Sequence, residues 1–189
     1  MTRALLVLIL ASLSAACGGS DETPANNASA SGTFDGVSFP VVNAVSAQVA
    51  DSKGTVSAVI LTTDANLCAE LGAGKSGKSQ KVIALYLYKA DNTTTSHAAT
   101  DLGDYAVTVT SAPGNYVEAD FTSEDATCTQ DVAHSGKASG GKVTLTAING
   151  SAYKGTFSLT LGSETMTGSF DSTACAAVQT LYDGNTTCN

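Results

Sequence analysis

The 189-residue chain carries a formal net charge of −8, because 17 acidic residues outnumber nine lysines and arginines. Such an acidic surface repels nucleic-acid phosphates and anionic lipid headgroups. We therefore exclude nucleic acid as a partner, and we expect any membrane attachment to come from something other than the protein surface. The length suits a single domain behind a short leader.

The chain begins with the layout of an export signal, MTRALLVLILASLSAACGGS. Arg3 provides a positive start, an apolar run of about ten residues follows that is too short to span a bilayer, and small residues precede Cys17. The segment LSAAC resembles the lipobox of bacterial lipoproteins, although Ser14 stands where leucine is usual. The resemblance implies a signal peptide over residues 1–16 and a lipid on Cys17. Ordinary secretory cleavage at the same bond is the alternative.

The same resemblance implies a location in the cell envelope, where fatty acyl chains on Cys17 attach the protein to a membrane. Gly18 and Gly19 follow the cysteine, with no acidic retention signal, which by analogy suits the outer membrane of a cell with two membranes. Residues 18–32 contain no large apolar side chain, so we expect residues 17–32 to be a lipidated cysteine and a disordered tether. Residues 33–189 then form a single β-domain.

Short segments of alternating apolar and polar residues fill this domain and predict β-strands. They are VVNAVSAQVA, TVSAVILTT, KVIALYLYK, YAVTVT, YVEADF, VAHSGKAS, KVTLTAI, YKGTFSLTL and ETMTGSFD. The third is apolar on both faces, as in a central strand, and glycine-rich turns between the last four predict a meander. DANLCAEL and STACAAVQTL predict two short helices. The sequence thus predicts an all-β fold, an antiparallel β-sandwich of about eight or nine strands, with a small closed β-barrel as the alternative.

The five cysteines fit this organisation. If Cys17 carries the lipid, Cys68, Cys128, Cys175 and Cys188 remain, and four cysteines in an exported chain predict two disulfides. Three pairings are possible. We expect Cys175–Cys188, which closes a short loop and ties down the C-terminus, together with Cys68–Cys128.

The segment GAGKSGKS at residues 72–79 matches the pattern of a phosphate-binding loop. Such a loop joins a buried strand to a following helix, whose N-terminus faces the phosphates. Here a predicted helix precedes the segment and a predicted strand follows it. We therefore predict a solvated loop and no bound nucleotide.

Candidate residues for other chemistry are few. His97 and His134 are the two histidines, and neither they nor the cysteines have zinc-ligand spacing. Asp131, His134 and Ser135 are close in sequence, but on a strand successive pairs would face opposite sides. Weak calcium candidates are Glu124 with Asp125, Asp101 with Asp104, and Asp183 with Asn185; none matches the twelve-residue calcium loop. We predict no catalytic residue, metal or cofactor, and hence no enzyme.

Tyr86 and Tyr88 share one face of the predicted central strand, where they would be buried or would line a carbohydrate or apolar-ligand surface. The sequence thus favours a lipid-anchored binding or structural module with an unknown protein or glycan partner. One alternative is a calycin-like carrier of a small apolar ligand, which would have an interior cavity. The other is an exported hydrolase with an unconventional site built on His134 or His97.

Overall fold

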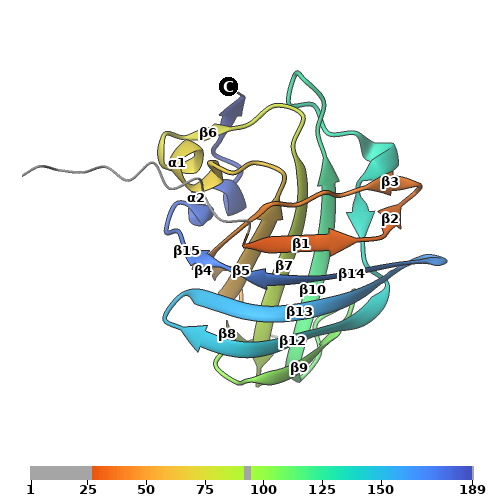
Figure 1. Ribbon diagram of the computed structural model, residues 1–189. Helices are drawn as coiled ribbons and strands as arrows, with labels where there is room; N and C mark the ends of the chain where they lie inside the picture. The colour runs from red at the N-terminus through yellow and green to blue at the C-terminus, as the bar shows by residue number, and fades with distance from the viewer. Residues whose placement is uncertain (1–26, 92–94, 189) are drawn as a thin grey trace, which may run out of the picture.

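The computed structural model of the chain describes residues 27–91 and 95–188 (Figure 1). The expected signal peptide, Cys17 and most of the expected tether lie outside these residues. The described chain is mostly β-structure, which confirms the all-β prediction. Eight of its strands have five residues or more, in agreement with the expected number.

The elements are β1 (Ala28–Ser31), β2 (Thr33–Phe34), β3 (Val37–Ser38), β4 (Asn43–Asp51), β5 (Gly54–Thr62), α1 (Leu67–Gly72), β6 (Lys75–Ser76), β7 (Lys81–Ala90), β8 (Ser96–Ala98), β9 (Gly103–Val107), β10 (Gly114–Ser123), the 3₁₀ helix η1 (Val132–His134), β11 (Gly136–Lys137), β12 (Gly140–Asn149), β13 (Ala152–Leu161), β14 (Glu164–Asp171), β15 (Thr173–Ala174), α2 (Val178–Tyr182) and β16 (Thr187–Cys188). Both short helices lie where the sequence predicts helical segments, although Cys175 precedes α2.

One 12-stranded sheet makes up the body of the domain, in the order β1-β14-β13-β12-β9-β10-β7-β8-β5-β4-β15, and β11 pairs with β10. The sheet curls into a half-barrel, in which β12, β13, β14 and β1 cross in front of β7 and β10 (Figure 1). The architecture is therefore one continuous curled sheet and not a clean sandwich of two. Most neighbouring strands are antiparallel, but β9 lies parallel to β10, and β15 lies parallel to β4.

Polar side chains join the two edges of the curled sheet. The amide of Asn27 donates from Nδ2 to the Ala44 carbonyl (3.0 Å) and accepts from the Ala44 N–H (2.6 Å), as a neighbouring strand would. The hydroxyls of Ser46 and Ser172 lie 2.7 Å apart, beside the point where β15 pairs with β4. These contacts satisfy backbone and hydroxyl groups that would otherwise be left open at the end of the ladder.

The folded domain begins at Ala28 and not at Thr33, so the prediction of a disordered tether is wrong for the last residues of that tether. Residues 28–31 form β1, which pairs with β14 along its whole length. Their small side chains suit this position because the strands pack closely: a Cβ atom on Gly168 would lie 2.1 Å from the carbonyl oxygen of Ser29. Main-chain hydrogen bonds hold this strand, and a composition argument based on apolar burial does not detect them.

The predicted four-strand meander is also corrected. Of the four predicted strands, β12, β13 and β14 form consecutive antiparallel hairpins, and β1 continues the sheet beyond them. The segment VAHSGKAS instead contains η1 and the two-residue β11, which pairs with β10. The Asp131 side chain caps η1 by accepting from the Ala133 N–H (3.2 Å), an interaction that favours a helical turn over a strand.

Two apolar clusters lie on opposite faces of the sheet. The inner core fills the half-barrel, because its members come from both the front and the back strands; it includes Leu85, Leu87, Val117, Phe157 and Leu159. The outer core lies on the other face of β4, β5, β7 and β10 and includes Val56, Ile60, Ala84 and Tyr88. Both faces of β7 are buried, as its sequence predicts. The helical cover, α1 and α2, contributes Leu67, Leu71 and Val178 to the outer core.

The disulfides pair differently from the expectation. Cys68 bonds to Cys175 and Cys128 bonds to Cys188, so the predicted Cys175–Cys188 and Cys68–Cys128 pairs are wrong. Cys175 is buried in the outer core beside α1, where its partner is 107 residues away in sequence. The second disulfide joins the turn before η1 to β16, the C-terminal strand. The argument from loop length failed because packing of the helical cover on the sheet decides which sulfur atoms meet.

Candidate ligand-binding site

A cavity of about 210 Å³ lies on the outer face of the sheet, where β5, β7 and β10 run next to the end of α2. We call it the outer cavity. Its walls are partly apolar and partly polar, and none of its ten lining residues is basic. The apolar lining residues are Ile60, Val82, Ala84 and Leu181, and the polar ones are Ser76, Gln80, Tyr86, Asp120, Thr122 and Glu124.

The register of β7 and β10 places these side chains together. The two strands are antiparallel, with Ala84 opposite Asp120 and Val82 opposite Thr122. Because side chains alternate between the faces of a strand, all four lie on the outer face. Ala84 is too small to fill the space beside Asp120, and the helical cover reaches this point only through Leu181. The space thus remains open at the border of the cover.

Four tyrosines pack in two pairs on the same face. Tyr88 stacks on Tyr116 with ring centroids 4.7 Å apart, and both are buried, which for Tyr88 is one of the two outcomes that the sequence allows. Tyr86 meets Tyr182 of α2 edge to face at 5.6 Å and lines the outer cavity. Burial, and secondarily the charge of Asp120, raises the pKa of Tyr86. Burial also raises the pKa of Tyr182, to about 12. Both phenols therefore stay protonated at neutral pH and can donate hydrogen bonds.

Two carboxylates of the outer cavity differ in their partners. Asp120 Oδ1 lies 3.1 Å from Lys137 Nζ, which also lies 4.0 Å from Glu118 Oε2. The contact with Lys137 is an ion pair without hydrogen-bond geometry, because this shielded oxygen has no hydrogen-bond partner among the described residues. Glu124 Oε2 is shielded from solvent and has no hydrogen-bond partner among the described residues. Burial, and secondarily the charge of Asp125, raises the pKa of Glu124. A shielded carboxylate oxygen without a donor is unusual in a folded protein, because its desolvation is not offset.

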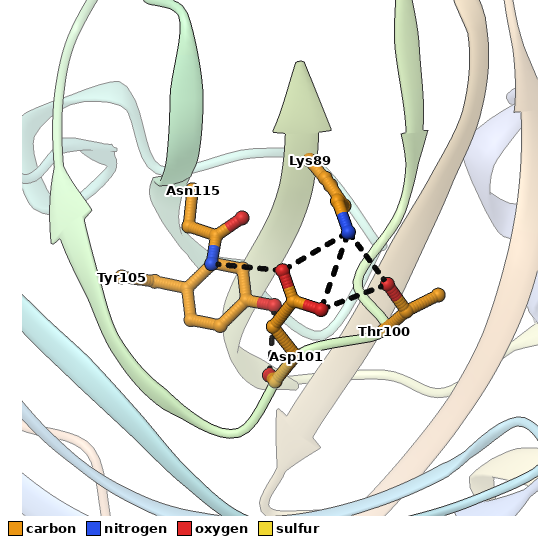
Figure 2. A network of polar contacts seen from close by, with 5 residues as sticks. All are labelled: Lys89, Thr100, Asp101, Tyr105 and Asn115. Carbon is orange, nitrogen blue, oxygen red and sulfur yellow. Dashed lines mark hydrogen bonds and ion pairs between the residues drawn. The ribbon is translucent and has the colours of Figure 1, made fainter. Parts of the chain in front are cut away.

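The other acidic residues considered for calcium are occupied elsewhere. Figure 2 shows the carboxylate of Asp101 between Lys89 Nζ, 3.1 Å away, and Asn115 Nδ2, 3.4 Å away. The Tyr105 hydroxyl donates to the Asp101 carbonyl (2.9 Å) and thereby holds the same loop. Hydrogen bonds from Lys89 and Asn115 lower the pKa of Asp101. This arrangement fixes the loop between β8 and β9 and leaves no vacant carboxylate there.

The remaining acidic candidates also serve local structure. Asp104 accepts from Thr144 and Lys142, at 2.5 and 2.9 Å. Asp125 accepts from Thr127 and Thr129, and Asp183 accepts from Gln179. Within residues 27–91 and 95–188, no three His, Cys, Asp or Glu side chains gather in a way that could hold a metal ion.

The two histidines each contact an aspartate. His97 Nε2 lies 3.1 Å from Asp91 on the surface, and His134 Nδ1 lies 2.6 Å from Asp131. The second contact corrects the expectation that these side chains point apart, because in a 3₁₀ helix residues three apart lie above one another. Ser135 Oγ accepts from the Ser123 N–H at 3.1 Å, and no hydrogen bond between the side chains of His134 and Ser135 is found in the described part of the chain.

The segment GAGKSGKS lies between elements in the predicted order. Helix α1 ends at Gly72, β6 covers Lys75–Ser76, and β7 begins at Lys81. A helix before the segment and a strand after it is the reverse of the order in a phosphate-binding loop, and it is the order that the sequence predicts. Ser76, in the middle of the segment, lines the outer cavity, as does Gln80, which follows the segment directly.

Comparison of the chain with protein-family models, with curated proteins and with solved structures gave no match. No helix of the described residues is long and apolar enough to cross a membrane. The outer cavity was missed in the sequence because Glu124 was considered only with its neighbour Asp125. The alternation of Asp120, Thr122 and Glu124 along one strand face was the available signal.

Proposed function

We propose that the protein is a lipid-anchored lipoprotein of the cell envelope and that its β-domain is a binding module rather than an enzyme. The observation that carries this proposal is the pairing of all four cysteines of the described domain in two disulfides. Cys17 then remains as the single cysteine available for a lipid. Disulfides form and persist in exported proteins, which agrees with the apolar leader before Cys17.

A binding role is supported by how the two faces of the sheet are filled. The inside of the half-barrel is occupied by the apolar side chains of the inner core, which favours a binding module over a calycin-like carrier. The outer cavity provides a concave space with apolar walls and a few converging polar groups, the usual composition of a small-molecule site. The hydrolase alternative has less support, because Ser135 Oγ accepts from the Ser123 N–H of β10 and no hydrogen bond between Ser135 and the Asp131–His134 pair is found among the described residues.

The position of β1 limits how far the domain can lie from the membrane. Only ten residues separate Cys17 from Ala28, the first residue of β1. Even a fully extended chain of that length spans at most about 40 Å. We therefore propose that the domain works close to the membrane surface.

Intact-mass analysis of the protein extracted from membranes tests this proposal. We expect a chain of residues 17–189 with acyl groups on Cys17 and four hydrogens fewer than the reduced form. The matched control is Cys17→Ser, which should keep both disulfides but appear without lipid in the soluble fraction. A full-length precursor with free thiols would contradict the proposal.

A further inference from the structure

We propose that the outer cavity binds a small organic cation, a primary ammonium group carried on a short apolar chain. The inference rests on the proposed binding function and names the class of ligand. It starts from the cavity itself, in which apolar side chains of the outer core lie beside two carboxylates.

The charge of the outer cavity favours a cation. Asp120 and Glu124 both line it, and no lysine, arginine or histidine does. The nearest ion-pair partner, Lys137, approaches Asp120 from β11 and is already shared with Glu118. Glu124 Oε2 has no donor at all among the described residues. An ammonium group supplies three N–H donors and a positive charge, which are what this oxygen lacks.

The size and the remaining walls limit what carries the ammonium group. A volume of about 210 Å³ admits only a small molecule or the end of a longer one. Ile60, Val82 and Leu181 present apolar surface, so an alkyl chain is favoured over a polar body. The ring of Tyr86, steadied by Tyr182, adds an aromatic surface of the kind that attracts organic cations.

Calorimetric titration of the purified, disulfide-bonded protein with three four-carbon probes tests this inference. n-Butylammonium has the proposed charge and chain, n-butanol keeps the chain without the charge, and butyrate reverses the charge. We expect n-butylammonium to bind at least about tenfold more tightly than n-butanol, and butyrate to bind least. Equal binding of n-butylammonium and n-butanol, or no binding of n-butylammonium, would overturn the inference.

Two substitutions place the binding in the outer cavity. Glu124→Gln should weaken n-butylammonium binding by about tenfold and leave n-butanol binding unchanged. Leu181→Phe should weaken binding of both, because it fills the space. Asp35→Asn is the matched control: it removes one negative charge from an exposed turn with a positive φ, which asparagine tolerates. Equal weakening in Asp35→Asn and Glu124→Gln would show only a general charge effect and would contradict the proposed site.

Intact-mass analysis and titration of the same wild-type preparation separate this inference from the proposed anchoring. Binding of n-butylammonium by wild-type protein that carries no lipid on Cys17 would refute the anchor and leave the site intact. A lipidated protein that does not bind the probe would refute the site and leave the anchor intact.

Discussion

The front half of the curled sheet (β1, β12, β13 and β14) buries one face, whereas the back half (β4, β5, β7 and β10) buries both. Along β13 buried and more exposed residues alternate, because one face packs on the inner core and the other meets solvent. Along β5 all seven residues from Val56 to Thr62 are buried. The back half therefore needs a second layer on its outer face, and the helical cover, held by Cys68–Cys175, provides part of it.

This difference shows where a fold of this kind can hold a ligand. The solvated face of the front half needs no cover and exposes mainly Thr and Ser side chains, whereas the outer face of the back half is apolar and only partly covered. At the border of the helical cover, where Leu181 meets β7, the outer cavity remains. A site at such a border can be shaped by the helical cover while the inner core keeps the sheet rigid.

The largest expected effect is the loss in free energy of unfolding when one buried leucine is truncated in each core. Leu85→Ala removes a fully buried side chain of the inner core, and we expect a loss of about 4 kcal/mol in the free energy of unfolding. Leu71→Ala makes the same change on the buried face of the six-residue α1. Because this short helix can shift to close the space, we expect a smaller loss of about 2 kcal/mol. Chemical denaturation of both variants measures the difference. Equal losses would mean that the helical cover is as rigid as the sheet.

A smaller effect is expected from the disulfides. Replacing Cys68 and Cys175 together by alanine should lower the free energy of unfolding by about 3 kcal/mol, because the unfolded chain gains freedom and the helical cover is released. The matched pair is Cys128 and Cys188, which lie at the less buried C-terminal strand and close a shorter loop. Thermal unfolding of the two double variants should show the lower melting temperature for the first. The reverse order would contradict the importance given to the helical cover.

The smallest expected effect is on pH dependence and concerns Glu124. Burial raises its pKa above the ordinary value of 4.5, so the fold holds the proton more tightly than the unfolded chain does. The resulting stability is fully present below pH 4.5 and is lost as the pH rises through the raised pKa. Glu124 is only about half buried, so solvent screens its charge and reduces the effect. Glu124→Gln should therefore raise stability at pH 7 by at most about 1 kcal/mol, up to about 3 °C in melting temperature, and change it little at pH 3.5.

Melting curves of Glu124→Gln and of Asp35→Asn at the two pH values check this. A variant that gains stability but binds n-butylammonium less well would separate ligand binding from folding, since residues at binding sites are often not optimal for stability. Loss of stability in Glu124→Gln at pH 7 would mean that the carboxylate has a structural partner.

Several features of the fold follow from local pattern alone. The run KVIALYLYK is apolar on both faces from Val82 to Tyr88, so its place between two apolar layers could be predicted from these residues. The alternation in β12, β13 and β14 likewise predicts strands with one face in solvent. The short helix around Cys68 was visible because its apolar residues recur at helical spacing.

Other features had no local signal. Strand β1 consists of four small residues that pack only because Gly168 of β14 lets the backbones approach. The segment around His134 has strand-like composition, yet the Asp131 side chain turns it into a 3₁₀ helix. Residues Gly72–Ser79 match the pattern of a phosphate-binding loop, but whether such a segment can bind phosphate depends on which elements precede and follow it.

Local sequence pattern and composition were enough to predict the all-β class, the central strand buried on both faces and the acidic charge. They also predicted two disulfides from four cysteines behind an export-like leader. The curl of the sheet, the pairing of the cysteines and the outer cavity depend on how distant segments pack. Alternation and composition report on neighbours in sequence. Cys175 bonds to Cys68, and Glu124 and Leu181 come to line one cavity, only after β-strands far apart in the chain have paired.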